Sequence, residues 1–220
     1  MARYDLGLSV RKSFDFLKEK FGADSTPRPV IVIDQSPNQA PASYNPGRNI
    51  LFLQTNDMEK LNSIGLHYAI GEEVSHYLHY QVNPWLLDAN RALADRVNSA
   101  KEEKEKDSAM LDYFILYNFI EFVGSYGALL YVEKCEGGKI AKDMGGELIK
   151  NLESFMGKED EAVAKHGIGY LVGFGAYCGV GDGYLRAASR INSFEQIKPI
   201  IMHPEFDSLK NLLETKPIQS

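Results

Sequence analysis

The sequence predicts an α+β fold that is mostly α-helical, and three observations support this prediction. Residues 30–33 (VIVI) and 49–54 (NILFLQ) are the two runs typical of β-strands. From residue 58 to near the C-terminus, apolar residues recur at helical spacing, and glycines and prolines interrupt the pattern. Strands and helices do not alternate, which excludes a doubly wound parallel sheet. We therefore expect a small antiparallel β element at about residues 29–54, followed by helices.

Each remaining segment follows from local composition. Residues 5–20 have the apolar spacing of an amphipathic helix. The segment between the two strand-like runs is rich in Pro, Asn and Ser, and we expect a loop there with a turn at residues 45–48 (NPGR). A helical pattern runs from Met58 through Gln81, with Asn56 or Asp57 as its N-cap. Further helices are expected at residues 85–106, 108–134, 139–156, 159–180, 184–200 and 204–214.

Length and composition limit the organisation and the partners. A chain of 220 residues is long enough for one sizeable core. We expect a single domain, residues 1–220, with an α/β lobe at about 1–82 and a helical lobe at about 84–220. Hydrophobic residues make up 44% and charged residues 25%, as in soluble globular proteins. The formal net charge is −6 without a clustered basic face, so neither nucleic acid nor an anionic membrane is an expected partner.

Residues 111–132 are long enough to span a membrane, but Asp112 and Glu121 lie within them. A carboxylate near the middle of a span costs a few kcal/mol, so we expect a buried core helix instead. The N-terminus carries charge throughout and lacks the apolar core of a secretory signal. Cys135 and Cys178 are far apart and match no metal-binding spacing, which is typical of free thiols in a reducing compartment. We expect a cytoplasmic protein.

The second predicted helix contains the letters EEVSH, in which Glu72, Glu73 and His76 lie on neighbouring parts of one flank. His79 extends the same flank by three residues. Ligands at positions i and i+4 of a helix converge on one point and can hold a single metal ion. The pattern differs from the zinc motif His-Glu-x-x-His only at Glu72, and a carboxylate can also bind zinc.

A further ligand is expected from Glu121, which lies in a run that is otherwise nearly all apolar. A buried carboxylate without a partner is costly. A metal ion shared with His76 satisfies this requirement, and so does a metal-free hydrogen bond to His76. Downstream, the letters HGIGY offer His166 or Tyr170 as an auxiliary donor to a negatively charged oxygen in a cleft. His79 is the substitute ligand if the site is rearranged.

Two strands with an Asn-Pro-Gly turn, a helix with x-Glu-x-x-His, and a glutamate about 45 residues later resemble the zincin metallopeptidases, specifically the compact gluzincins (minigluzincins). The resemblance covers roughly residues 28–130. It implies a divalent metal, zinc first with manganese or iron as alternatives, held by His76 and Glu121. It also implies Glu73 as general base and a peptide or protein as substrate. The sequence departs from the family at Glu72, where the first histidine ligand is expected. A charged oxygen there weakens the pull of the metal on bound water and favours Mn, Fe or Mg.

Three functions fit these residues. The first is a zincin-like metalloprotein with Glu72, His76 and Glu121 as metal ligands, either an active peptidase or an inactive relative that binds peptides or a partner protein. The second is a ferritin-like carboxylate protein, because Glu73 and His76 have the i, i+3 spacing of such sites. No second Glu-x-x-His occurs in the chain, however. The third is a helical interaction protein without a metal site, in which His76 and Glu121 lie far apart.

Overall fold

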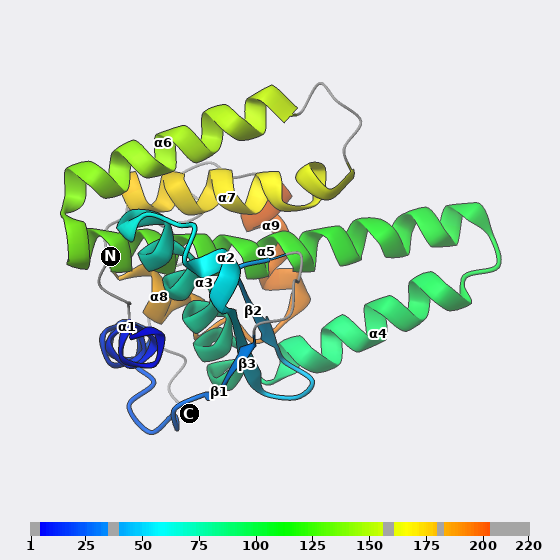
Figure 1. The fold of residues 1–220 in the computed structure, drawn as a ribbon. Helices are drawn as coiled ribbons and strands as arrows, with labels where there is room; N and C mark the ends of the chain where they lie inside the picture. The colour runs from blue at the N-terminus through cyan, green and yellow to red at the C-terminus, as the bar shows by residue number, and fades with distance from the viewer. Residues whose placement is uncertain (1–4, 35–39, 156–160, 180–182, 203–220) are drawn as a thin grey trace.

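A computed structural model of the chain describes residues 5–34, 40–155, 161–179 and 183–202. The fold is α+β and mostly helical, as predicted (Figure 1). A small sheet lies at one side of the molecule, and helices form the rest. Buried apolar side chains from both the N-terminal and the helical parts of the chain belong to one contiguous core.

The sheet has three strands in the order β1-β3-β2: β1 (Val30–Asp34), β2 (Ala42–Asn45) and β3 (Ile50–Gln54). The expected antiparallel pairing of the first and last strands is wrong, because β1 runs parallel to β3. The segment expected to be a loop contains β2, which is antiparallel to β3. The predicted turn at residues 45–48 therefore joins β2 to β3. Two parallel strands cannot be joined by a tight hairpin, which explains why the connection from β1 to β3 is long and includes β2.

The first helices differ from the predicted boundaries mainly at their starts. Helix α1 (Leu6–Phe21) ends at Gly22, whose φ of +67° is the left-handed conformation that glycine adopts most readily. The predicted helix from Met58 is two elements, α2 (Thr55–Met58) and α3 (Ser63–Val82). The N-cap of α3 is Asn62, whose side chain accepts the Gly65 N–H at 2.8 Å. This later cap replaces the expected Asn56 or Asp57.

The helical part broadly follows the predicted order. Its elements are α4 (Trp85–Ser99), α5 (Glu103–Glu136), α6 (Gly138–Phe155), α7 (Glu161–Gly179), α8 (Tyr184–Ala188) and α9 (Phe194–Met202). The predicted helix at 85–106 ends early, because the charged run at 101–107 forms the exposed connection and first turn of α5. The predicted helix at 184–200 is divided into α8 and α9, and the one at 204–214 lies outside the described residues.

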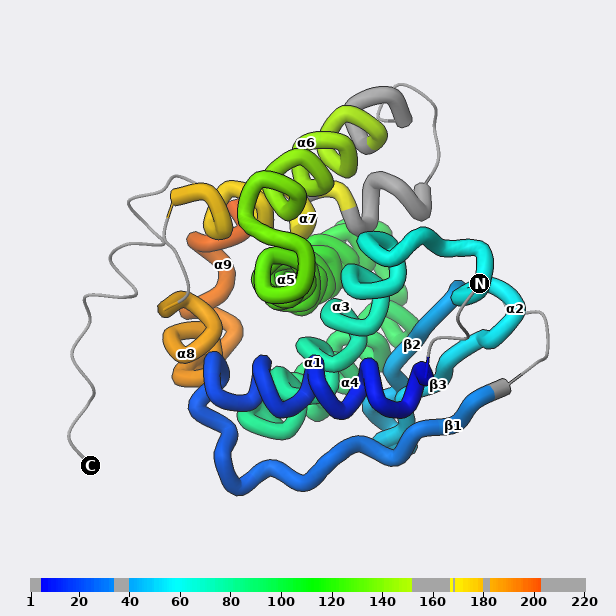
Figure 2. The backbone as a smooth tube through the Cα atoms, turned by 60° about the vertical axis from the view of Figure 1, so that its left-hand side comes forward, coloured from blue at the N-terminus to red at the C-terminus, as the bar shows by residue number. Residues whose placement is uncertain are grey.

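Helix α5 is the centre of the fold. Figure 2 shows it nearly end-on, with α1, α3, α6 and α7 around it. Within the described residues it is the one helix long and apolar enough to cross a membrane, and 94% of its most apolar window is buried inside the protein. The core helix predicted at residues 111–132 is therefore confirmed. Helix α4 runs beside its N-terminal half (Figure 1), where Arg96 pairs with Asp112 at 3.0 Å.

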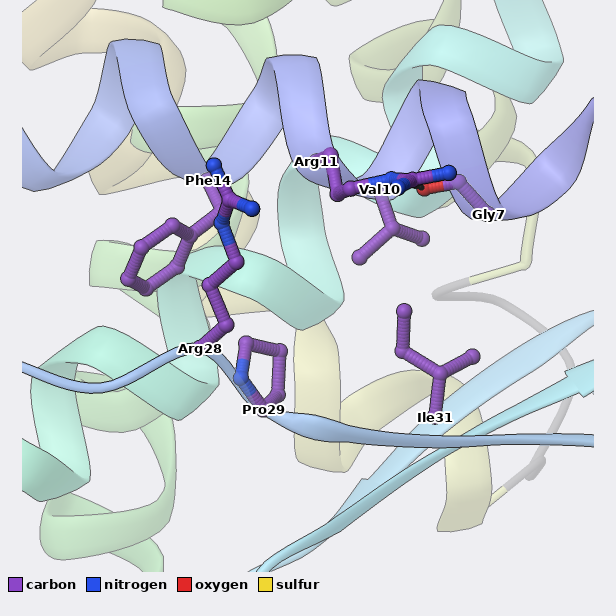
Figure 3. A pocket seen from close by; sticks show the side chains of 7 residues that line it. All are labelled: Gly7, Val10, Arg11, Phe14, Arg28, Pro29 and Ile31. Carbon is purple, nitrogen blue, oxygen red and sulfur yellow. Dashed lines mark hydrogen bonds between the residues drawn. The ribbon is translucent and has the colours of Figure 1, made fainter.

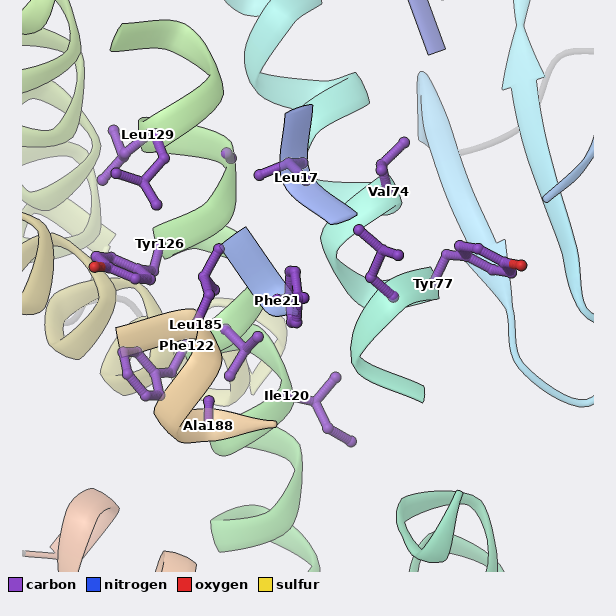
Figure 4. Packing of buried hydrophobic residues seen from close by; sticks show 14 of the residues in the cluster. Leu17, Phe21, Val74, Tyr77, Ile120, Phe122, Tyr126, Leu129, Leu185 and Ala188 are labelled. Carbon is purple, nitrogen blue, oxygen red and sulfur yellow. The ribbon is translucent and has the colours of Figure 1, made fainter. Parts of the chain in front are cut away.

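Small residues let α3 and α7 approach α5 closely. A Cβ atom added at Gly127 would collide with the Ser75 hydroxyl, and one added at Gly173 would collide with the Ser125 hydroxyl. Around these contacts, large side chains from α1, α3, α5 and α8 interlock (Figure 4). Fully buried Tyr77 illustrates this packing, because its ring lies in the core and its hydroxyl donates to the Pro27 carbonyl. Helices α3, α5 and α7 thus pack closely together, and the residues of the candidate site lie on them.

A separate apolar hollow of about 280 Å³ lies between α1 and β1 (Figure 3). Its lining residues are Gly7, Val10, Arg11, Phe14, Arg28, Pro29 and Ile31. Arg28 pairs there with Asp15 at 3.0 Å. None of the lining residues is one of the predicted metal ligands or catalytic groups.

Candidate metal centre

The structure brings together the three predicted ligands Glu72, His76 and Glu121. Glu72 and His76 lie one turn apart on α3, and Glu121 faces them from α5. One ligand atom from each lies within 4.8 Å of the other two. His76 Nε2 is 4.0 Å from Glu121 Oε2, which confirms the expected proximity of these residues. The hypothesis of an interaction protein without a metal site required His76 and Glu121 to lie far apart, and this distance contradicts that requirement.

The ligand set is buried and incompletely paired. His76 is 8% exposed and Glu121 7% exposed, while Glu72 is partly exposed. Glu72 Oε1 and His76 Nδ1 are buried without a hydrogen-bond partner. A buried polar atom left unpaired costs about 1–3 kcal/mol. A metal ion at the centre would satisfy Glu72 Oε1, whereas His76 would bind it through Nε2, the nitrogen nearest Glu121, which leaves Nδ1 unpaired.

The spacing of the donor atoms fits a metal ion. Zinc–nitrogen and zinc–oxygen bonds are about 2.0–2.2 Å, so two ligand atoms on one tetrahedral ion lie about 3.4 Å apart. The His76–Glu121 distance of 4.0 Å is slightly longer than this, and it is too long for a hydrogen bond. Closing the outer spacing of 4.8 Å requires shifts of less than about 1 Å from each side chain. The residues therefore fit a divalent cation.

Glu73 adds a third carboxylate beside the ligand set. Burial raises the pKa of Glu72 well above 4.5, and the charges of Glu121 and Glu73 raise it further. Burial also raises the pKa of Glu73, while His76 and the backbone N–H of Tyr44 lower it. A bound cation would relieve the mutual repulsion of these carboxylates.

Tyrosines surround the acidic groups. Tyr170, on α7, is hydrogen-bonded to Glu72, and Tyr117 is hydrogen-bonded to Glu121. Tyr68 is buried near Glu72 and Glu121, and its hydroxyl has no hydrogen-bond partner. Burial and the neighbouring carboxylates raise the pKa of all three phenols, so they stay neutral hydrogen-bond donors at pH 7.

The sequence analysis missed Tyr68 and Tyr117, although a signal was present. Each lies four residues before a glutamate of the centre, at Glu72 and Glu121, and therefore on the same helix face. Tyr170, predicted as an auxiliary oxyanion donor, lies at the centre, where its hydroxyl is bonded to Glu72. Its observed contact is thus with a ligand side chain.

Glycines make room for the ligands. A Cβ atom at Gly124 would overlap the His76 ring, and one at Gly169 would lie 2.6 Å from Cβ of Glu121. The Gly169 N–H also donates to Asn118 Oδ1 at 2.8 Å, which links α7 to α5 one turn from the ligand Glu121. These contacts set the positions of the imidazole ring and the carboxylate before any ion binds.

The other two auxiliary candidates do not join the described ligand group. His79 is fully buried between the rings of Phe21 and Phe119, at centroid distances of 6.5 and 5.2 Å. Neither of its ring nitrogens has a hydrogen-bond partner. Helices α1 and α5 cover α3 at His79. The polar flank of α3 that carries Glu72 and His76 therefore ends before His79. The side chain of His166 lies outside the part of the chain that the structure describes.

Comparison of the chain with protein families, with curated proteins and with solved structures gave no match. A functional assignment therefore depends on the chemistry of the centre itself.

Proposed function

We propose that the protein is a divalent-metal-dependent hydrolase of the zincin type that acts on peptide bonds. In this proposal Glu72, His76 and Glu121 hold the metal, and Glu73 is the general base. The observation that carries the proposal is the convergence of one imidazole nitrogen and two carboxylate oxygens within 4.8 Å. The unpartnered, buried Oε1 of Glu72 supports it.

The donor set supports zinc as the proposed metal, with manganese or iron as the alternatives. Zinc binds imidazole nitrogen and carboxylate oxygen in four-coordinate sites that leave one position open. The proposed centre has two carboxylates and one imidazole, whereas a His-Glu-x-x-His site with a glutamate ligand has one carboxylate and two imidazoles. The additional oxygen ligand reduces the preference of the centre for zinc over manganese and iron. It also reduces the net positive charge of the occupied centre.

A divalent ion at such a centre polarises a carbonyl group and lowers the pKa of bound water. The residues of the chain supply the remaining chemistry. Glu73 accepts the proton of the attacking water, and its raised pKa brings its basicity closer to neutral pH. The Tyr44 N–H keeps the Glu73 carboxylate in place. The unpartnered hydroxyl of Tyr68 donates to the oxygen that becomes negatively charged in the transition state.

Metal content tests the proposal directly. Untagged protein purified without chelator is analysed by elemental mass spectrometry, before and after incubation with zinc and manganese. We expect close to one equivalent of metal per chain, lost on Glu121→Gln. We expect Glu73→Gln to keep the metal and to lose hydrolysis of a fluorogenic peptide library. Absence of metal after incubation with both ions would refute the proposal.

Glu72→His provides the matched gain-of-function variant. It restores the first histidine of His-Glu-x-x-His and is expected to raise zinc affinity, because it replaces an oxygen ligand by imidazole. Zinc titrations of both proteins measure the change. Equal zinc affinity in the two proteins would show that Glu72 does not occupy a ligand position. Metal binding without peptide hydrolysis would favour the inactive relative over the enzyme.

A further inference from the structure

Strand β1 forms an open edge of the sheet beside the hollow under α1. It is hydrogen-bonded to β3 on one side, and no strand that the structure describes lies on its other side. Residues 30–33 are all apolar and β-branched, and Val30 and Ile33 are 58% and 54% exposed. Edge strands usually carry charge or are covered, because their bare N–H and C=O groups pair with strands of other chains. This uncharged apolar edge therefore indicates a surface that a partner covers.

The hollow between α1 and β1 provides a pocket next to this edge (Figure 3). Val10 and Phe14 line it from α1, and Pro29 and Ile31 line it from the opposite side. Its volume of about 280 Å³ is just below the range of about 300–1,000 Å³ that is usual for small-molecule pockets. The hollow is therefore sized for one or two apolar side chains and not for a complete cofactor.

The two charged side chains that line the hollow are both arginines. Arg28 is paired with Asp15, so its charge is balanced. Arg11 makes no ion pair with any side chain that the structure describes, and its Nε donates to the Gly7 carbonyl at 3.2 Å. The nearest carboxylate along α1, Asp5, is the N-cap of the helix. The terminal nitrogens of the exposed Arg11 guanidinium can therefore bind a carboxylate through two parallel hydrogen bonds.

We propose that this groove binds the C-terminal segment of a partner protein. The segment adds as a strand to the open edge of β1, its last apolar side chain enters the hollow, and its terminal carboxylate binds Arg11. A peptide C-terminus complements all three features, because one residue carries the backbone, the apolar side chain and the carboxylate. Strand addition, side-chain pockets and carboxylate capture are established modes of peptide recognition. None of the lining residues belongs to the metal centre, so this inference is independent of the proposed hydrolase.

The first test compares two peptide pools that differ only in their last group. Both consist of N-acetylated hexapeptides with randomised apolar final residues, and they end either in a free carboxylate or in an amide. Each pool is incubated with the full chain, and bound peptides are measured by affinity-selection mass spectrometry. We expect at least fivefold greater retention of the free-acid pool. Equal retention of both pools, or retention of neither, would overturn the proposal.

Arg11→Gln and Lys12→Gln form a matched pair of variants. Each removes one exposed cation from α1, but only Arg11 lines the hollow. We expect Arg11→Gln to remove the preference for the free-acid pool and Lys12→Gln to stay within twofold of the parent. A similar loss in both variants would show a general effect of charge and would overturn the assignment of the carboxylate to Arg11.

Amide hydrogen exchange distinguishes strand addition from binding in the hollow alone. A retained free-acid peptide should slow exchange in residues 30–34 at least fivefold, because its backbone covers open N–H groups of β1. Octanoate has an apolar chain and a carboxylate but no peptide groups, so it should leave this exchange unchanged. Unchanged exchange with the peptide bound would overturn the strand addition. An equal effect of octanoate would indicate a site for small carboxylates and would overturn the peptide as occupant.

Discussion

His76 and His79 lie three residues apart on α3 and are both buried, yet they have opposite surroundings. His76 faces Glu121, with Nε2 at 4.0 Å from the carboxylate, and belongs to the candidate metal centre. His79 lies between Phe21 and Phe119 and is fully excluded from solvent. Burial lowers the pKa of His79 to about 3, and the charge of His76 contributes to this shift. His79 is therefore a neutral core residue.

The difference teaches that neighbouring helices decide the role of each histidine. Helical spacing alone puts the two rings on one flank of α3. At His76, the opposing residue of α5 is Gly124, which makes room for the ring beside Glu121. At His79, α1 and α5 present phenylalanines instead. Each histidine can therefore be changed while the other serves as its control.

The largest effect is expected from His76→Leu, which removes the only nitrogen ligand of the group. Structural zinc sites with four ligands bind with about 10–16 kcal/mol, or roughly 3 kcal/mol per ligand. We therefore expect zinc affinity to fall by at least about 100-fold, measured by competition with a chromophoric chelator.

His79→Leu is the matched variant, since it makes the same substitution three residues away in the aromatic surroundings. Its zinc affinity is expected to stay within about threefold of the parent, because His79 is not part of the ligand group. A comparable loss of zinc in both variants would contradict the distinction between the two histidines.

A second, smaller effect is expected from Gly124→Ala, which acts on His76 without changing a ligand. The added methyl group overlaps the imidazole ring, and both must shift in a packed interior. Overpacking of this kind costs about 1–3 kcal/mol in unfolding free energy. Urea denaturation of the metal-free protein measures the loss, and zinc titration measures the accompanying displacement of the ligand.

Gly146→Ala on α6 controls for the general effect of replacing a helical glycine. No atom lies within 4 Å of the added methyl group there. We expect a gain of up to about 1 kcal/mol from helix propensity. If Gly124→Ala were as stable as Gly146→Ala, the His76 ring would not be packed against Gly124.

The sequence predicted the helical order and the ligand group because both depend on local periodicity. Spacing within α3 placed Glu72 beside His76, and the isolation of Glu121 in an apolar helix indicated a buried polar partner. The distance between His76 and Glu121, in contrast, depends on the packing of α3 against α5. Glycines at the contact allow this packing, and the spacing of glycines in the sequence does not predict which helices meet.

The parts that were wrong depend on contacts distant in sequence. Parallel pairing of β1 with β3 is set by the crossover and by β2, a four-residue strand with mixed polarity. The environment of His79 required knowledge that α1 covers this part of α3. The role of Tyr68 was missed because a buried tyrosine in an apolar pattern is usually a core residue. The position of its unpartnered hydroxyl near Glu72 and Glu121 distinguishes it, and only the fold shows that position.

The last expected effect, within the range given for Gly124→Ala, concerns the pH dependence of stability, and it isolates His79. Its pKa is lowered from 6.5 to about 3 in the folded protein, so below pH 6.5 the unfolded chain binds a proton that the folded chain does not. Stability is then lost as the pH falls from about 6.5 towards 3. Between pH 7 and pH 5 this histidine should cost about 2 kcal/mol in unfolding free energy.

Urea denaturation of the metal-free parent and of His79→Leu at both pH values tests this. The leucine variant should lose about 2 kcal/mol less than the parent between pH 7 and pH 5, because it has no group to protonate. The carboxylates of the metal centre are common to both proteins, so their contribution cancels in the difference. Equal losses would mean that His79 takes up its proton while folded, which a ring held between Phe21 and Phe119 without a partner cannot do at low cost.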